Sequence, residues 1–126
     1  MNIVDSSGWL EYFADGPKAS SFEKPLQDLE NLIVPTICLF EVFKVVLRER
    51  SENDALQAIA LMKQGKVVDL SAEIALEAAK ISHDNKIPMA DSIVLATAWN
   101  WDATIWTQDS DFEKLGRVKY FPKKNS

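Results

Sequence analysis

Two short apolar segments of the chain each lead into an aspartate. Asp5 directly follows Ile3–Val4, whereas Asp109 comes just after Thr104–Thr107 and is itself followed by Asp111. In open parallel sheets, ligands bind just outside the carboxyl ends of the strands. If both segments are parallel strands, Asp5 and Asp109 lie at the same sheet edge. Carboxylates gathered at one edge are the hard oxygen ligands that suit Mg²⁺ or Mn²⁺.

Two further carboxylates stand out because their neighbours are apolar. Glu41 lies within Leu39–Phe43, and Asp91 lies within Ile87–Val94 at the start of an expected helix. Burying an unpaired carboxylate is costly, so Glu41 needs a cation, hydrogen bonds or a water-filled cleft. Asp91 has an alternative role in capping the helix or interacting with its dipole. Together with the two aspartates at the strand ends, these acids predict a metal-binding cleft, because four like charges at one edge repel each other without a cation.

The elements that must position these acids alternate between strand and helix. We predict strands at residues 2–5, 32–35, 66–70, 104–107 and 118–121, and helices at residues 20–32, 36–50, 71–84 and 89–101, with two more beginning near Ser6 and Ser51. This alternation predicts a three-layer α/β/α fold with a central, mostly parallel sheet of about five strands. No linker or internal repeat interrupts residues 1–126, which we therefore expect to form one domain.

Polar residues at the expected helix ends predict local structure. Ser6 or Ser7, Thr36 and Ser51 are candidate N-caps, and Ser51 has Asp54 three residues later, as in a capping box. Asp102 follows the last apolar helix, where a left-handed residue is expected, and aspartate tolerates that conformation better than most residues.

Composition restricts the class of protein. The chain has 126 residues, a formal net charge of -5 and one cysteine, Cys38, which we expect in the core. The sequence has no apolar run of membrane-spanning length and no export signal, so we expect a cytoplasmic protein. The negative charge argues against binding nucleic acid by bulk electrostatics alone. It is compatible with a nuclease, because bound cations reverse the local field.

The chain resembles PIN-domain proteins of the VapC-type toxin family, the ribonuclease half of bacterial toxin–antitoxin pairs. The resemblance extends over nearly the whole length and depends on four segments in this order. These segments are Ile3–Ser7, Phe40–Val42, Ile87–Ile93 and Trp106–Phe112. Each of them is weak alone, but their order in a chain of this size is specific.

The resemblance implies a Mg²⁺- or Mn²⁺-dependent endoribonuclease with a metal-activated water. The implied catalytic and metal-binding quartet is Asp5, Glu41, Asp91 and Asp109. Asp111 is an alternative to Asp109 or a support for it, and one ion or two are both compatible with the pattern. The resemblance also implies a homodimer, a cognate antitoxin protein as inhibitor and an RNA substrate, with tRNA favoured over mRNA.

Two hydroxyl residues beside the quartet are candidates for orienting carboxylates or contacting phosphate. Ser6 has helix capping as its alternative role, and Thr107 has simple strand-end hydrogen bonding. The sequence departs from many relatives at Asp102, where glycine is common, and in the bulk of Trp99 and Trp101. These departures affect partner contacts rather than the quartet.

Two rival functions remain. A catalytically silent PIN-like interaction module would be expected to have lost part of the quartet, which this chain retains. A metal-dependent phosphatase with Asp5 as its nucleophile would usually carry a second acid two residues later, where this chain has Ser7.

Overall fold

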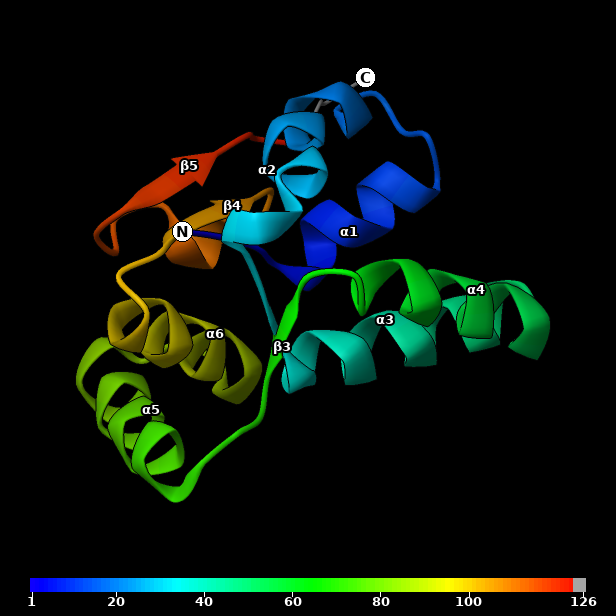
Figure 1. The fold of residues 1–126 in the computed structure, drawn as a ribbon. Coiled ribbons are helices and arrows are strands. Elements are labelled where there is room, and N and C mark those ends of the chain that lie inside the picture. Colours follow the sequence, from blue (N-terminus) through cyan, green and yellow to red (C-terminus); the bar gives the residue numbers. More distant parts are fainter. Residues whose placement is uncertain (124–126) are drawn as a thin grey trace.

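The computed structural model describes residues 1–123, and five parallel strands form a single sheet at its centre (Figure 1). The strand order is β3-β2-β1-β4-β5. All four neighbouring pairs are parallel. The bounds are β1 Asn2–Val4, β2 Leu32–Pro35, β3 Lys66–Val68, β4 Thr104–Thr107 and β5 Val118–Tyr120. The predicted α/β class with a parallel five-stranded sheet is confirmed.

Helices connect the strands and cover the sheet. They are α1 Ser6–Phe13, α2 Glu23–Gln27, α3 Thr36–Glu49, α4 Glu52–Met62, α5 Ala72–Asn85 and α6 Met89–Asn100. Figure 1 shows α5 and α6 packed together on one side, with α1 and α2 toward the other. Helix α3 contacts β2, α1 and α6, so it lies between the two groups. Within residues 1–123, no helix is both long and apolar enough to cross a membrane.

Burial explains why these segments adopt these structures. Ile3, Val4, Ile33 and Val34 on the two neighbouring strands β1 and β2 are at most 1% exposed, as expected for parallel strands that are covered on both faces. Helix α6 is buried at every position from residue 92 to residue 98, the pattern of a helix that is apolar on all sides. The sheet and α6 therefore form a buried framework that carries polar residues at its ends.

The predicted helix at residues 20–32 is wrong. The chain instead forms a 3₁₀ helix at Ala19–Phe22, then α2, and a second 3₁₀ helix at Leu29–Asn31. Pro25 lies within α2, and its ring would clash with the carbonyl of Ser21 in a continuous α-helix. A helix that begins at Glu23 avoids the conflict, because the first turn needs no N–H partner for Pro25.

Several predicted helix ends also need correction. Neither Ser6 nor Ser7 caps α1, because the N-cap is Asp5, whose side chain accepts a hydrogen bond from the Gly8 amide. The N-cap of α3 is Pro35 rather than Thr36. Strand β3 ends at Val68, two residues before the predicted end at Leu70.

Two other local predictions are confirmed. Ser51 caps α4 by accepting a hydrogen bond from the Asp54 amide at 3.1 Å. Asp102 has a φ of 53°, in the left-handed region, and its carboxylate accepts a hydrogen bond from Arg117.

Candidate metal centre

The carboxyl ends of β1 and β4 bring Asp5 and the Thr107–Asp111 segment together. The two strands are neighbours, with Val4 opposite Trp106, and the Asp5 amide donates a hydrogen bond to the Trp106 carbonyl at 3.2 Å. Asp109 is the N-cap of a 3₁₀ helix at Ser110–Phe112, which turns the chain back beside the sheet edge. The parallel register therefore places these acids at one edge, as the sequence pattern predicts.

Asp5 is a buried carboxylate with donors on both oxygens. It is 4% exposed. Its Oδ1 accepts hydrogen bonds from the Ser7 hydroxyl at 2.7 Å and the Gly8 amide at 3.1 Å, and its Oδ2 accepts one from the Thr107 hydroxyl at 2.7 Å. Burial raises the pKa of Asp5 to about 6 against the opposing effect of these donors, and the negative charge of Asp109 adds to the rise.

Three further carboxylates form a tight group. One carboxylate oxygen from each of Asp91, Asp109 and Asp111 lies within 4.8 Å of the other two. Burial, followed by the charge of Asp109 and the nearness of both neighbouring carboxyl groups, raises the pKa of Asp91 to about 8. The Asp109 carboxylate also accepts a hydrogen bond from the Asp111 backbone amide at 2.9 Å. This bond shapes the turn that brings both side chains to Asp91.

Glu41 approaches the site from α3 and lies outside the group of three. Its side chain is half-buried, and Oε1 accepts a hydrogen bond from the Ser6 hydroxyl at 2.6 Å. Cys38 is buried on the same helix, three residues before Glu41. Burial raises the pKa of the Cys38 thiol, and the negative charges of Asp5, Glu41 and Asp91 add to the rise.

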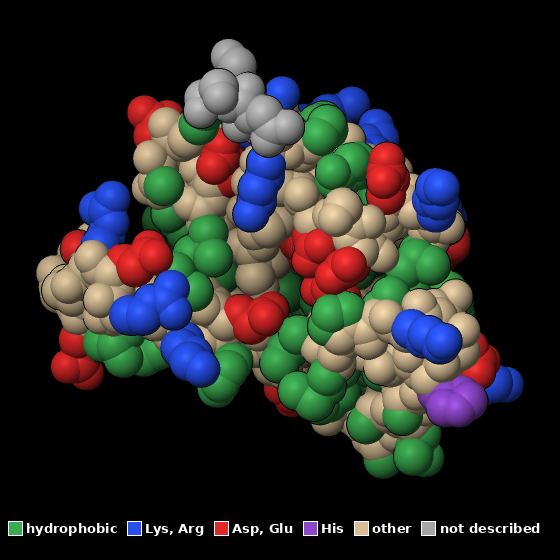
Figure 2. Space-filling view, turned by 180° about the vertical axis from the view of Figure 1, so that it is seen from behind, with side chains coloured by type: hydrophobic (Ala, Val, Ile, Leu, Met, Phe, Trp, Pro, Cys, Tyr) green, Lys and Arg blue, Asp and Glu red, His purple; other side chains and the backbone are tan. Residues whose placement is uncertain are grey.

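The chemistry of the donors fits a divalent cation. Among the described residues, the ion pairs are Arg48–Glu49, His83–Asp84 and Arg117–Asp102, and none of them neutralises an acid of the site. Acidic side chains also form a contiguous patch near the middle of the face in Figure 2. Asp91, Asp109 and Asp111 would hold a cation such as Mg²⁺ or Mn²⁺, with Asp5 beside them.

The raised pKa of Asp91 predicts a pH dependence of stability in the metal-free protein. The folded state keeps a proton on Asp91 up to about pH 8, whereas the unfolded chain releases it near 3.8, so folding binds a proton between these values. The free energy of unfolding should therefore fall as the pH rises from about 4 to about 8. Urea unfolding in chelator at several pH values measures this slope. It should be shallower in Asp91→Asn, and an unchanged slope in this variant would contradict the assignment.

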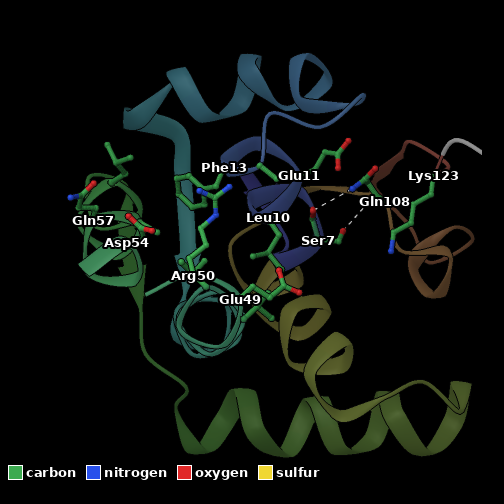
Figure 3. A pocket seen from close by; sticks show the side chains of 15 residues that line it. Ser7, Leu10, Glu11, Phe13, Glu49, Arg50, Asp54, Gln57, Gln108 and Lys123 are labelled. Carbon is green, nitrogen blue, oxygen red and sulfur yellow. Dashed lines mark hydrogen bonds between the residues drawn. The ribbon is translucent and has the colours of Figure 1, made fainter. Parts of the chain in front are cut away.

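A groove of about 520 Å³ adjoins the site (Figure 3). It lies between α1, the end of α3 and α4, and apolar side chains such as Leu10, Val46 and Leu61 line it. Ser7 and Gln108 lie at one end of the groove (Figure 3). There the backbone amide of Gln108 donates a hydrogen bond to the Ser7 hydroxyl oxygen at 3.1 Å. Because Ser7 also donates to Asp5, the groove and the acidic site share one hydrogen-bond network.

The predicted site residues are thus distributed unevenly. Asp91, Asp109 and Asp111 form the close group, and Thr107 connects Asp5 to the segment that carries Asp109. Glu41 lies outside this group, with its Oε1 bonded to Ser6. Sequence reasoning missed the contribution of Ser7 and Gln108. The only sequence signal for Ser7 is its position two residues after Asp5, and for Gln108 its place between Thr107 and Asp109.

Comparison with known proteins identifies a family and several solved structures that share this fold. The PIN domain family model matches residues 3–118. The fold is similar to a chain of a toxin–antitoxin complex from Klebsiella pneumoniae, with a TM-score of 0.81 and 18% identity, covering 98% of this chain and 100% of that one.

Two other solved structures share the fold at similarly low identity. VapC20 from Mycobacterium tuberculosis, described as a sarcin-ricin loop cleaving toxin, has a TM-score of 0.78 and 17% identity, covering 94% of this chain and 97% of its own. DNA-bound VapBC from Salmonella typhimurium has a TM-score of 0.73 and 13% identity, covering 97% and 98%. The sequence has no match among curated proteins. The match over residues 3–118 shows that the chain belongs to the PIN-domain family, as its motifs predict.

Proposed function

We propose that this protein is a Mg²⁺- or Mn²⁺-dependent endoribonuclease and the toxin of a toxin–antitoxin pair, acting in the cytoplasm. The observation that carries the proposal is the group of three carboxylates, Asp91, Asp109 and Asp111, within 4.8 Å of one another beside the buried Asp5. Membership of the PIN-domain family and the similarity to VapC20, described as cleaving the sarcin-ricin loop, support RNA as substrate. A structured RNA such as tRNA is the substrate class that we favour.

The residues of the site have separable tasks. A divalent cation supplies Lewis-acid stabilisation of a phosphodiester oxygen and lowers the pKa of water. Asp91, Asp109 and Asp111 provide the negative charge that holds the cation, and Asp5 contributes from the end of β1. Glu41, held through Oε1 by the Ser6 hydroxyl, would add its negative charge to the site from α3.

The geometry disfavours both rival functions. An aspartyl nucleophile needs a free carboxylate oxygen in line with the phosphorus atom. Asp5 is 4% exposed and carries a hydrogen-bond donor on each oxygen, so it is poorly suited to attack. A silent interaction module has no need for a partly buried carboxyl group beside other acids, whereas here burial, followed by the charge of Asp109, raises the pKa of Asp91 to about 8.

RNA cleavage by the purified chain tests the proposed function. The protein should cut structured RNA internally in Mg²⁺ or Mn²⁺ and leave a simple phosphomonoester intact. Addition of the small protein encoded by the neighbouring reading frame should stop cleavage, because toxin–antitoxin complexes are among the similar structures. Hydrolysis of the monoester without RNA cleavage would favour the phosphatase, and activity toward neither substrate would favour the interaction module.

We also propose a homodimer formed through the outer face of α3. Phe40 is 61% exposed and Leu47 is 45% exposed, and with Phe43 they border a shallow apolar groove of about 490 Å³. Figure 2 shows hydrophobic side chains gathered below the acidic patch. Exposed apolar patches of this kind mark interaction surfaces. A second copy of the chain would cover this face and remove it from water.

A charge on this face should prevent dimer formation. Phe40→Glu is expected to convert a dimer to a monomer, because burying the new carboxylate without a partner is costly. Light scattering coupled to size-exclusion chromatography measures the mass. Leu29→Glu, which changes another exposed leucine outside α3, is the matched control and should remain dimeric. A dimeric Phe40→Glu protein would contradict this interface.

A further inference from the structure

The Asp5 carboxylate has almost no free hydrogen-bonding capacity. An ionised carboxylate offers about four acceptor positions, two on each oxygen. On Oδ1, the Ser7 hydroxyl at 2.7 Å and the Gly8 amide at 3.1 Å occupy both positions. On Oδ2, the Thr107 hydroxyl at 2.7 Å occupies one. The acceptor position that remains is therefore on Oδ2.

The two hydroxyl groups are themselves oriented by consecutive backbone amides. The Gln108 amide donates to the Ser7 hydroxyl oxygen at 3.1 Å, and the Asp109 amide donates to the Thr107 hydroxyl oxygen at 2.8 Å. A hydroxyl has a single hydrogen, so each group accepts from the amide and donates to Asp5. Figure 3 shows the bonds between Ser7 and Gln108, including a second one from the Gln108 side chain to the Ser7 carbonyl at 3.4 Å.

This arrangement connects Asp5 to the segment that carries Asp109. Ser7 belongs to α1 and Thr107 ends β4, and their hydroxyl oxygens lie 3.4 Å apart. The side chain of Asp5 therefore cannot rotate without breaking bonds to both segments. Ser7 itself is half-buried, and it both donates to Asp5 and lines the groove.

We propose that Ser7 is a positioning residue which, together with Thr107, restricts Asp5 to binding a divalent cation through Oδ2 alone. The inference rests on the proposed function, because it assigns a role to Ser7 in the same metal centre. Carboxylate ligands depend on the hydrogen bonds that orient them, and losing such a bond typically weakens metal binding by about 10- to 100-fold. Ser7→Ala removes one of these bonds and adds no bulk.

Titration of Mn²⁺ into the purified chain, without RNA and followed by calorimetry, tests this role directly. Ser7→Ala and Thr107→Val should each raise the dissociation constant by about tenfold or more. Thr107→Ser keeps the hydroxyl and should bind Mn²⁺ nearly as the unchanged protein does. In the double variant of Ser7→Ala and Thr107→Val, the dissociation constant should rise by less than the product of the two single increases. Either change alone already releases the Asp5 carboxylate, so the second change has less to remove.

Two control variants remove comparable hydroxyl groups elsewhere. Ser82→Ala removes a half-buried hydroxyl that donates to the Ile87 carbonyl at 2.7 Å, and Thr97→Val removes a buried one that donates to the Ile93 carbonyl at 2.8 Å. Both should bind Mn²⁺ with unchanged affinity. Alanine favours helix more than serine, so a loss in Ser7→Ala does not arise from weakening α1. Thermal unfolding of each variant identifies any that fails to fold. If Thr107→Val does not fold, the comparison of Ser7→Ala with Thr107→Ser still tests the role of Ser7.

The outcomes separate this inference from the function on which it rests. Unchanged Mn²⁺ affinity in Ser7→Ala, while Asp91→Asn loses binding, would overturn the role of Ser7 and leave the metal centre intact. Equal losses in Ser7→Ala and Ser82→Ala would also overturn it. If the unchanged protein binds no Mn²⁺, both the inference and the proposed metal centre fail.

Discussion

Asp91→Asn is expected to lower kcat/KM for RNA cleavage by at least about 100-fold while making the metal-free protein more stable. The loss follows because the substitution removes one negative charge from the group of three carboxylates, and a single electrostatic contact in an active site is typically worth 10²- to 10³-fold. The gain in stability follows because burial, together with the charges of Asp109 and Asp111, disfavours an ionised Asp91 and raises its pKa to about 8. Activity and stability should thus change in opposite directions.

A fluorogenic RNA substrate measures the first effect, and urea unfolding in chelator at pH 8 measures the second. Asp84→Asn is the matched control, because Asp84 is an exposed aspartate on α5 that contacts His83. It should change neither quantity appreciably. A variant Asp91→Asn that is both inactive and less stable would indicate a structural role for Asp91. Full activity would contradict the site.

Removal of divalent cations is expected to abolish cleavage, and their return should restore it. The acids of the site lack a positive partner among residues 1–123, so a bound cation relieves their mutual repulsion as well as enabling the chemistry. Mn²⁺ should therefore also raise the melting temperature, because a ligand that binds only the folded state stabilises it.

The comparison with a variant makes this second test specific. Asp91→Asn should show a much smaller rise in melting temperature with Mn²⁺ than the unchanged protein, while Asp84→Asn should show the full rise. Cleavage that persists in excess chelator would exclude a metal-dependent mechanism. An equal rise in all three proteins would place the bound Mn²⁺ away from Asp91.

The sequence predicts which acids lie at the carboxyl edge of the sheet. In a chain that alternates strand and helix, an acid that follows an apolar strand is expected at that edge. Asp5 and Asp109 lie together because β1 and β4 are parallel neighbours in matched register. Apolar spacing alone predicts a continuous helix at residues 20–32. Pro25 overrides that spacing, since a proline within a continuous helix costs roughly 3 kcal/mol.

The remaining details of the site depend on contacts between distant segments. The choice between Asp109 and Asp111 cannot be made from their spacing, because the 3₁₀ turn brings both carboxylates to Asp91. Ser7 resembles a helix cap in sequence, yet Asp5 takes that role and Ser7 donates to Asp5 instead. The backbone amide of Gln108, 101 residues later in the sequence, donates to the Ser7 hydroxyl oxygen. This bond leaves the single hydroxyl hydrogen of Ser7 to be donated to Asp5.

We infer that acids from separate elements of this PIN domain bind one divalent cation. Anomalous scattering from crystals grown with Mn²⁺ can locate that ion independently of any activity. We expect a peak contacting Asp91 and Asp109 or Asp111, on the side of Asp5 that presents Oδ2. Crystals that show no peak at saturating Mn²⁺, or a peak remote from Asp91, would contradict it.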